Sequence, residues 1–200
     1  MGANRVTSVE HSMMQDEIKA WRKEMRTRLI AQRCALTPVD RVQRDTFLAS
    51  ALRAQLAGLE GKLAFYWPMH GEFDARPIVT DWLRQNAQRR AALPIVLEKA
   101  APLGFRAWMP EEPMVAGIFG TTVPARDVRV VPSALLIPLV GFDELGYRLG
   151  YGGGFYDRTV AELASLSPRV VTIGIGYELG RLPTIHPQPY DCKLDHLLTA

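Results

Sequence analysis

RLGYGGGFYD, at residues 148–157, follows the apolar run ALLIPLV at residues 134–140, and these two stretches decide the fold. Near-continuous hydrophobicity over Ala134–Val140 is typical of a strand that is covered on both faces. Four of the five residues 150–154 are glycine, so the backbone can take positive φ angles and approach another group closely. A helix is expected over 157–166. The sequence therefore predicts a buried strand, a glycine-rich loop and a helix in succession.

Helices and strands also alternate over the rest of the chain. Apolar residues at three- and four-residue spacing predict a helix over Met14–Ala35. Thr37 and Pro38 are suited to the cap and first turn of a second helix, which runs to about Leu56. A third helix is expected over 75–88, and short apolar runs predict strands at 62–67, 93–97, 104–108 and 170–175. This alternation indicates an α/β layer fold with a largely parallel sheet.

Two segments lack such a pattern. Residues 1–13 are polar and are expected to form a flexible N-terminal tail. Residues 110–127 carry three prolines and are expected to be a loop. We find no internal repeat and no credible boundary within residues 14–200, which are therefore expected to form a single domain.

The glycine-rich segment has the composition of an anion site. Successive backbone N–H groups, followed by a helix N-terminus, can bind phosphate. Arg148 can add a phosphate ligand, Tyr156 a ring for stacking, and Asp157 a carboxylate suited to Mg²⁺. The segment lacks the Gly-Lys-Ser/Thr ending of a Walker A loop and is not the GxGxxG fingerprint. A tight structural turn is the alternative explanation for these glycines.

Composition excludes several classes of protein. There are 24 Lys and Arg against 21 Asp and Glu, without a long run of one sign, so a nucleic-acid partner is not expected. The two cysteines lack CxxC spacing, which indicates reduced thiols rather than a zinc site. The first residues lack the apolar region of a signal peptide, and no apolar stretch could span a bilayer. The sequence thus predicts a cytoplasmic protein without membrane association.

Residues 138–158, PLVGFDELGYRLGYGGGFYDR, resemble the signature of the 5-formyltetrahydrofolate cyclo-ligase family. The apolar strand, the Phe-Asp pair, the glycine turn and the Arg-Leu-Gly-x-Gly-x-Gly-Phe-Tyr-Asp run occur in the family's order. The resemblance implies a three-layer α/β/α fold similar to the NagB/RpiA/CoA-transferase-like fold. It also implies ATP as co-substrate, Mg²⁺ as cofactor, 5-formyltetrahydrofolate as substrate, with or without a polyglutamate tail, and a monomeric enzyme.

The resemblance also implies roles for individual residues. Arg148 and Asp157 would be catalytic, and Asp157 would hold Mg²⁺ together with Asp191. Trp67 and Glu72 would bind the folate, together with Tyr151, Gly152, Gly153, Gly154 and Phe155. The residues implied to bind ATP are Lys19, Ala20, Trp21, Arg22, Lys23, Arg148, Leu149, Gly150, Tyr151, Gly152, Gly153, Gly154, Phe155 and Tyr156. Whether Arg22 or Lys23 supplies the second phosphate contact stays open.

Each of these residues also has a simpler explanation. The basic residues between Lys19 and Lys23 could be a solvated helix face. Trp67 could be a core residue, Glu72 a surface acid and Asp191 a turn cap. Two positions depart from the family pattern, because Gly153 stands where many members carry Lys and Val123-Pro124 replaces a Glu-Pro pair.

Two other functions compete with the cyclo-ligase. The first is a non-catalytic folate- or nucleotide-binding module, which the missing lysine at position 153 favours. The second is a sugar-phosphate isomerase or acyl-CoA transferase on a similar layered fold. That chemistry needs a catalytic Glu or an Asp–His set, and no such set has supporting spacing in this sequence.

Overall fold

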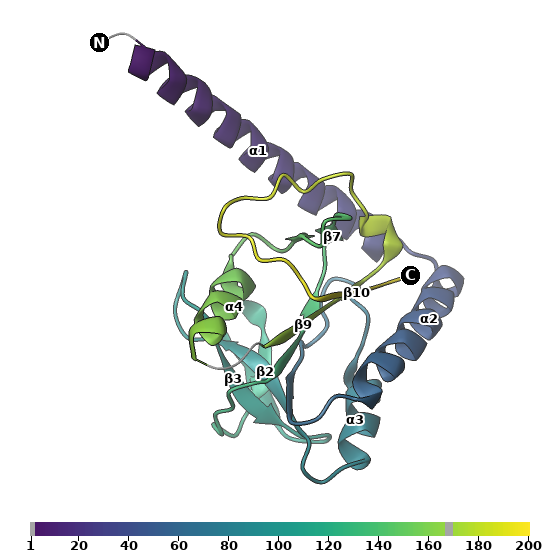
Figure 1. Cartoon of the computed structure of the whole chain (residues 1–200). Coiled ribbons are helices and arrows are strands. Elements are labelled where there is room, and N and C mark those ends of the chain that lie inside the picture. Colours follow the sequence, from purple (N-terminus) through teal and green to yellow (C-terminus); the bar gives the residue numbers. More distant parts are fainter. Residues whose placement is uncertain (1–2, 167–169) are drawn as a thin grey trace.

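The computed structural model describes the backbone of residues 3–166 and 170–200 and the side chains of residues 14–166 and 170–200. Its central feature is a six-stranded sheet in the order β10-β9-β6-β1-β2-β3 (Figure 1). All neighbouring strands run parallel except β2 and β3, which are antiparallel. The strands are β1 Lys62–Ala64, β2 Arg90–Val96, β3 Leu103–Trp108, β6 Ala134–Pro138, β9 Val171–Gly176 and β10 His196–Thr199. The largely parallel sheet predicted from the sequence is therefore confirmed.

Helices cover both faces of this sheet. The helices α2 (Pro38–Ala57) and α3 (Arg76–Arg84) lie against one face, and α4 (Phe155–Leu166) lies against the other (Figure 1). Alternate residues of β6 divide between the two layers, since Leu136 packs in the cluster with α2 and α3 while Leu135 and Ile137 pack towards α4. Burial on both faces explains the continuous apolar runs of the inner strands, and the predicted α/β/α layering is confirmed.

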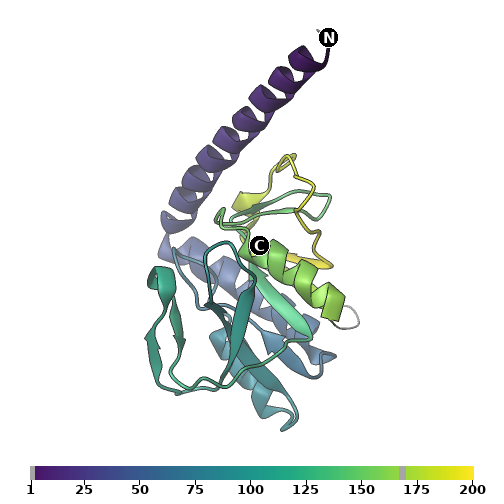
Figure 2. The ribbon, with the colours of Figure 1, turned by 90° about the vertical axis from the view of Figure 1, so that its left-hand side faces the viewer.

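The first helix, α1 (Ala3–Cys34), stands apart from these layers. Its C-terminal half packs Met25 and Leu29 against Val140, Leu149 and a later loop, while its N-terminal end points away from the sheet (Figures 1 and 2). The helix begins at Ala3 rather than at the expected Met14. The flexibility expected for residues 1–13 stays a prediction, as does the single-domain organisation of residues 14–200.

The expectation of a simple loop over residues 110–127 is wrong. This segment forms an antiparallel hairpin of β4 (Met114–Ala116) and β5 (Thr122–Pro124), joined through the short 3₁₀ turn η1 (Ile118–Gly120). The loop was predicted because prolines are rare inside strands. Pro124 is tolerated here because it lies at the end of a strand in a separate two-stranded sheet. The hairpin matters for function because its tip reaches the cavity described below.

Shorter elements complete the chain. The strands β7 (Gly141–Phe142) and β8 (Arg148–Leu149) pair antiparallel, and η2 (Glu178–Gly180) is a second 3₁₀ turn. The predicted cap of α2 is confirmed, since the Thr37 side chain accepts a hydrogen bond from the Asp40 amide and Pro38 opens the helix. The strand β10 was not predicted, because its four residues carry no alternation strong enough to mark them.

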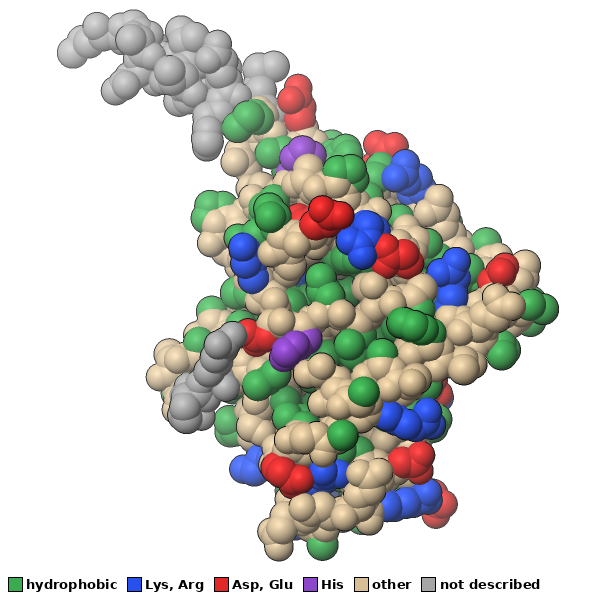
Figure 3. All heavy atoms as spheres, turned by 45° about the vertical axis from the view of Figure 1, so that its right-hand side comes forward, with side chains coloured by type: hydrophobic (Ala, Val, Ile, Leu, Met, Phe, Trp, Pro, Cys, Tyr) green, Lys and Arg blue, Asp and Glu red, His purple; other side chains and the backbone are tan. Residues whose placement is uncertain are grey.

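Surface and membrane properties follow from the same description. On the face shown in Figure 3, Lys and Arg are interspersed with Asp and Glu rather than gathered in one stripe. Among the described residues, no helix has the length and apolar character that crossing a membrane requires. Cys34 and Cys192 are both free thiols.

Candidate active site

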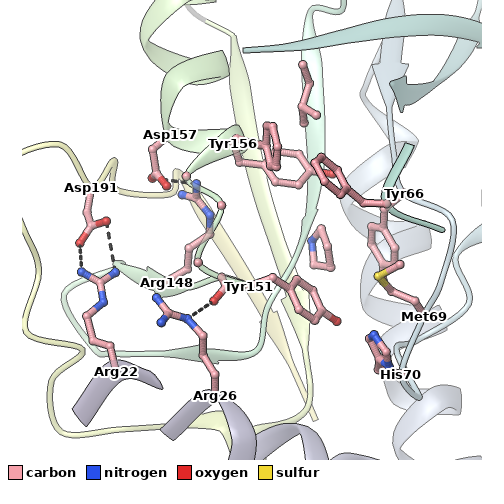
Figure 4. A pocket seen from close by; sticks show the side chains of 18 of the residues that line it. Arg22, Arg26, Tyr66, Met69, His70, Arg148, Tyr151, Tyr156, Asp157 and Asp191 are labelled. Carbon is pink, nitrogen blue, oxygen red and sulfur yellow. Dashed lines mark hydrogen bonds and ion pairs between the residues drawn. The ribbon is translucent and has the colours of Figure 1, made fainter. Parts of the chain in front are cut away.

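A cavity of about 1150 Å³ opens at the carboxyl ends of the parallel strands (Figure 4). Ligands of open α/β sheets bind at this edge, because the loops that follow the strands meet there. The walls come from α1, from the loop after β1, from the glycine-rich loop before α4, and from residues 188–191. The tip of the β4–β5 hairpin closes another side with Phe119 to Thr122.

Arginines dominate the end of the cavity beside α1. Arg22 forms a bidentate pair with Asp191, with Nη1–Oδ2 and Nη2–Oδ1 distances of 2.8 and 3.3 Å. One helical turn later, Arg26 Nε donates to the Gly150 carbonyl at 2.7 Å and so ties α1 to the glycine-rich loop. Lys19 and Lys23 also line the cavity, and within the described part of the chain neither has an ion pair. Two lysines therefore remain available to an anionic ligand.

A second ion pair lies deeper, where β8 meets α4. Arg148 Nη2 donates to Asp157 Oδ1 at 2.8 Å, and its Nη1 donates to the Cys192 carbonyl at 3.2 Å. The same Oδ1 accepts the Cys192 amide at 3.2 Å. Asp157 Oδ2 has no hydrogen-bond partner among the described residues, and the side chain is 20% exposed. Asp157 thus keeps one oxygen for a ligand.

The glycine-rich loop needs its glycines for conformation and for space. Gly152 and Gly154 have φ angles of 94° and 63°, in the left-handed region that favours glycine. At Gly152, a Cβ atom would also approach the Arg26 guanidinium to 3.3 Å. The loop leads directly into the first turn of α4, where Asp157 lies. Backbone N–H groups at a helix N-terminus favour an anion, so the loop has the composition of a phosphate cradle.

The opposite end of the cavity is aromatic. Its rings come from three separate segments, and Figure 4 shows that Tyr66, Tyr151 and Tyr156 lie on one side, away from the arginines. The ring centroids of Phe119, at the hairpin tip, and Phe155 are 6.4 Å apart. The rings that line this end are Tyr66, Trp67, His70, Phe119, Tyr151, Phe155 and Tyr156. Such a surface suits a flat, mainly apolar ring system.

One carboxylate, Glu72, lies within this aromatic end. Its side chain is 3% exposed, its Oε2 accepts the Met69 amide at 2.9 Å, and its Oε1 accepts the Tyr151 hydroxyl. Burial raises the pKa of Glu72, while the hydrogen bonds from Tyr151 and Met69 and the charge of Arg33 oppose that rise. A buried, aimed acceptor of this kind can recognise N–H donors on a ligand.

Most of the residues proposed from the sequence line this cavity together. Trp67 does so while also packing on the core, and Arg76 stacks over its ring at 4.4 Å. Two residues do not line the cavity. Trp21 packs edge-on against His186 at 4.7 Å, and Leu149 is fully buried beside Met25. The proposed residues that line the cavity are Lys19, Ala20, Arg22, Lys23, Trp67, Glu72, Arg148, Gly150, Tyr151, Gly152, Gly153, Gly154, Phe155, Tyr156, Asp157 and Asp191.

The structure adds residues that the sequence analysis did not select. Arg26 could have been found, because it lies four positions after Arg22 on the same helix face. Arg33 and Phe119 carried no local signal, since one is a single arginine near a helix end and the other stood in an expected loop. Their roles depend on contacts between segments that are far apart in the chain.

The fold and the cavity together define a class. This is an α/β protein in which one cavity joins a cation-rich, glycine-lined end to an aromatic end that contains the carboxylate of Glu72. Among the described residues, no group of three His, Cys, Asp or Glu side chains gathers as a ready-made metal site. A ligand with phosphates at one end and a flat ring at the other therefore fits the arrangement.

Comparison with known proteins identifies the family. The family model for the 5-formyltetrahydrofolate cyclo-ligase family matches residues 18–200. Because the match covers nearly the whole chain, the chain belongs to this family. The resemblance seen in residues 138–158 is thereby confirmed.

Individual relatives agree with this result. A 5-formyltetrahydrofolate cyclo-ligase of Haemophilus influenzae is 28% identical, over 90% of this chain and 97% of that protein. A namesake of Mycolicibacterium smegmatis is 30% identical over 76% of this chain and 81% of that protein. Among solved structures, the 5,10-methenyltetrahydrofolate synthetase of Mycoplasma pneumoniae has a TM-score of 0.71 at 25% identity, covering 88% of this chain and 97% of that one. The corresponding protein of Aquifex aeolicus has a TM-score of 0.69 at 26% identity and covers 89% of both chains.

Proposed function

We propose that this chain catalyses the ATP-dependent cyclisation of 5-formyltetrahydrofolate to 5,10-methenyltetrahydrofolate, with release of ADP and phosphate. Besides family membership, one structural observation supports this proposal. The cation-rich end and the aromatic end are parts of one continuous cavity, so a nucleotide phosphate and a folate ring could meet inside it.

The reaction needs two bond-making steps. The formyl oxygen on N5 attacks the γ-phosphorus of ATP, and ADP departs. N10 then attacks the activated formyl carbon and releases its proton to solvent, the ring closes, and the C–O bond breaks so that phosphate leaves with the former formyl oxygen. Phosphoryl transfer of this kind depends on positioning and charge neutralisation rather than on a protein nucleophile.

The cation-rich end supports the first step. Lys19 and Lys23 can contact the phosphates directly, because neither is committed to a carboxylate among the described residues. This suggests Lys23 rather than Arg22 for the second contact on α1, since Arg22 is held by Asp191. Arg148 and the backbone amides of residues 150–154 can neutralise charge that develops on the transferred group.

A magnesium ion bound with ATP would fit beside Asp157. Mg²⁺ usually takes one or two protein carboxylates together with substrate phosphates, and Asp157 Oδ2 is unoccupied by any described side chain. Asp191 would first have to give up part of its bidentate pair with Arg22. The ion would screen the phosphate charge, and Asp157 would hold it against the first turn of α4.

The aromatic end supports folate binding. Trp67 and Phe155 offer ring faces to the pterin or the aminobenzoyl group, and Glu72 offers a carboxylate to the N–H donors of the pterin. We further propose that the enzyme is a cytoplasmic monomer that also accepts polyglutamylated substrate. The non-catalytic module and the isomerase or transferase receive no support from the family match or the relatives.

The test follows absorbance of the methenyl chromophore with purified protein, 5-formyltetrahydrofolate and Mg²⁺, with and without ATP. We expect an ATP-dependent rise that Asp157→Asn abolishes. Asp127→Asn is the matched control, because Asp127 also pairs with arginines but lies away from the cavity. Folate binding without any ATP-dependent rise in the wild-type protein would refute the proposal and favour the binding module.

A further inference from the structure

Arg33, close to the end of α1, is held in one orientation by three hydrogen bonds. Its Nε donates to the His70 carbonyl and its Nη1 to the Leu139 carbonyl, both at 2.9 Å. Its Nη2 donates to the Tyr151 hydroxyl at 2.7 Å. The side chain is 4% exposed, so solvent does little to screen its charge. A buried arginine therefore connects the loop after β1, the end of β6 and the glycine-rich loop.

The guanidinium group of Arg33 also lies close to the carboxylate of Glu72. The Nη2 atom lies 3.8 Å from Glu72 Oε1, which also accepts the hydrogen bond from the Tyr151 hydroxyl. Tyr151 thus accepts from Arg33 and donates to Glu72, and it relays the arginine's position to the carboxylate. The other titratable groups that face Glu72 are Tyr66 and His70, both on the loop after β1, and Tyr156 from α4. Among the described residues, Arg33 is the permanent cation in this set.

The loop that carries Glu72 has an unusual backbone. His70 and Gly71 both have positive φ, at 48° and 72°, which is costly for a residue with a side chain. Two arginines stabilise this turn. Arg33 binds the His70 carbonyl, while Arg41 on α2 donates to the Gly71 carbonyl and to the Arg33 carbonyl, both at 2.8 Å. Arg41 supports the turn without an ion pair to Glu72.

We propose that Arg33 is a positioning residue for the folate end of the cavity, which holds Glu72 as an aimed carboxylate both directly and through Tyr151. The inference rests on the proposed contact between Glu72 and the folate. A carboxylate buried to this degree is costly to ionise unless a cation or donors compensate. Without Arg33, Glu72 would take up a proton more readily and would lose acceptor strength towards the pterin N–H groups.

The test compares the pH dependence of kcat/KM for 5-formyltetrahydrofolate in Arg33→Gln, Arg33→Lys and Arg41→Gln. In Arg33→Gln we expect the acid limb of the profile to move to higher pH by about one to three units, the usual effect of a close opposite charge. Arg33→Lys retains the charge and should restore most of the profile. The KM for ATP should stay at the wild-type value, because Arg33 lies outside the cation-rich end.

Arg41→Gln is the matched control. It removes a buried arginine from the same turn and should lower the melting temperature, yet it should leave the acid limb in place. Protonation of ATP and of its metal complex is common to all variants, so differences between the profiles report on the protein. An unshifted acid limb in folded Arg33→Gln would overturn the inference and leave Arg33 as a structural contact only.

A second variant covers the case in which Arg33→Gln does not fold. Tyr151→Phe removes the relay hydroxyl while it keeps the ring, and it should weaken 5-formyltetrahydrofolate binding more at acid than at alkaline pH, as measured by Trp fluorescence without ATP. Equal weakening at every pH would contradict the relay. Failure of the proposed function is distinguishable, because it would appear as an inactive wild-type protein, whereas failure of this inference would leave the wild-type enzyme active.

Discussion

Gly153 and Phe155 provide the sharpest test of the cavity's shape. A Cβ atom built on Gly153 would lie 2.7 Å from the Cδ2 and Cε2 atoms of the Phe155 ring, far inside carbon–carbon contact distance. Gly153 does not have a left-handed φ angle, so its backbone accepts an L-residue. Gly153→Ala should therefore displace the Phe155 ring and leave the backbone of the loop unchanged.

The expected magnitude follows from the loss of one aromatic contact. An aromatic pair contributes about 0.5–1.5 kcal/mol beyond its buried area, which corresponds to a loss of affinity of about 2- to 12-fold. Quenching of intrinsic Trp fluorescence on titration with 5-formyltetrahydrofolate, without ATP, would measure this loss. The melting temperature should change little, because Gly153 lies on the exposed part of the loop.

Gly150→Ala is the control from the same loop. Its Cβ would meet nothing within 4 Å, and its φ is also outside the left-handed region. Folate affinity should therefore stay at the wild-type value in this variant. Unchanged folate affinity in Gly153→Ala would refute the placement of Phe155 at the folate. The same geometry means that a lysine at position 153 would require Phe155 to move in this chain.

Three further predictions concern the hairpin, the core and the buried acid. Phe119→Ala should raise the KM for folate but not for ATP in steady-state assays, with little effect on stability, because Phe119 is 64% exposed at the hairpin tip; an equal rise in both KM values would contradict its placement. Leu48→Ala should lower the free energy of unfolding in urea by about 2–5 kcal/mol, because Leu48 is fully buried; a loss well below this range would mean that the core closes around the gap. Burial raises the pKa of Glu72, so the folded state binds the proton more tightly and the stability from this group is lost as pH rises through its folded pKa. The melting temperature of Glu72→Gln minus that of the wild type should thus increase with pH. The expected increase is about 2–4 °C for each kcal/mol of unfolding free energy that the wild type loses. A difference that does not vary with pH would refute this reasoning.

The secondary structure shows where local sequence is sufficient. The cap of α2 was predictable because Thr37 and Pro38 act within one helical turn. The inner strands were predictable because β6 is buried along its whole length. The β4–β5 hairpin was not, since its pairing depends on residues across a turn and its prolines resemble those of a loop. The start of α1 was also misplaced, because the helix at Ala3 has no sharp apolar boundary.

The sequence by itself determined the family, the layered fold and many of the residues that line the cavity, because the segment around Arg148–Asp157 concentrates loop conformation, charge and aromatic rings within ten neighbouring positions. Only the tertiary structure decided how those residues are paired. Asp191 meets Arg22 across 169 positions, and Tyr151 meets Glu72 across 79. It also excluded Trp21 and Leu149 from the cavity wall and added Arg26 and Phe119 to it. Arg33 was placed behind that wall, against Tyr151 and Glu72. The physical reason is that local sequence fixes conformation over a turn or a strand, whereas the partner of a buried charge depends on which distant segments the core brings together.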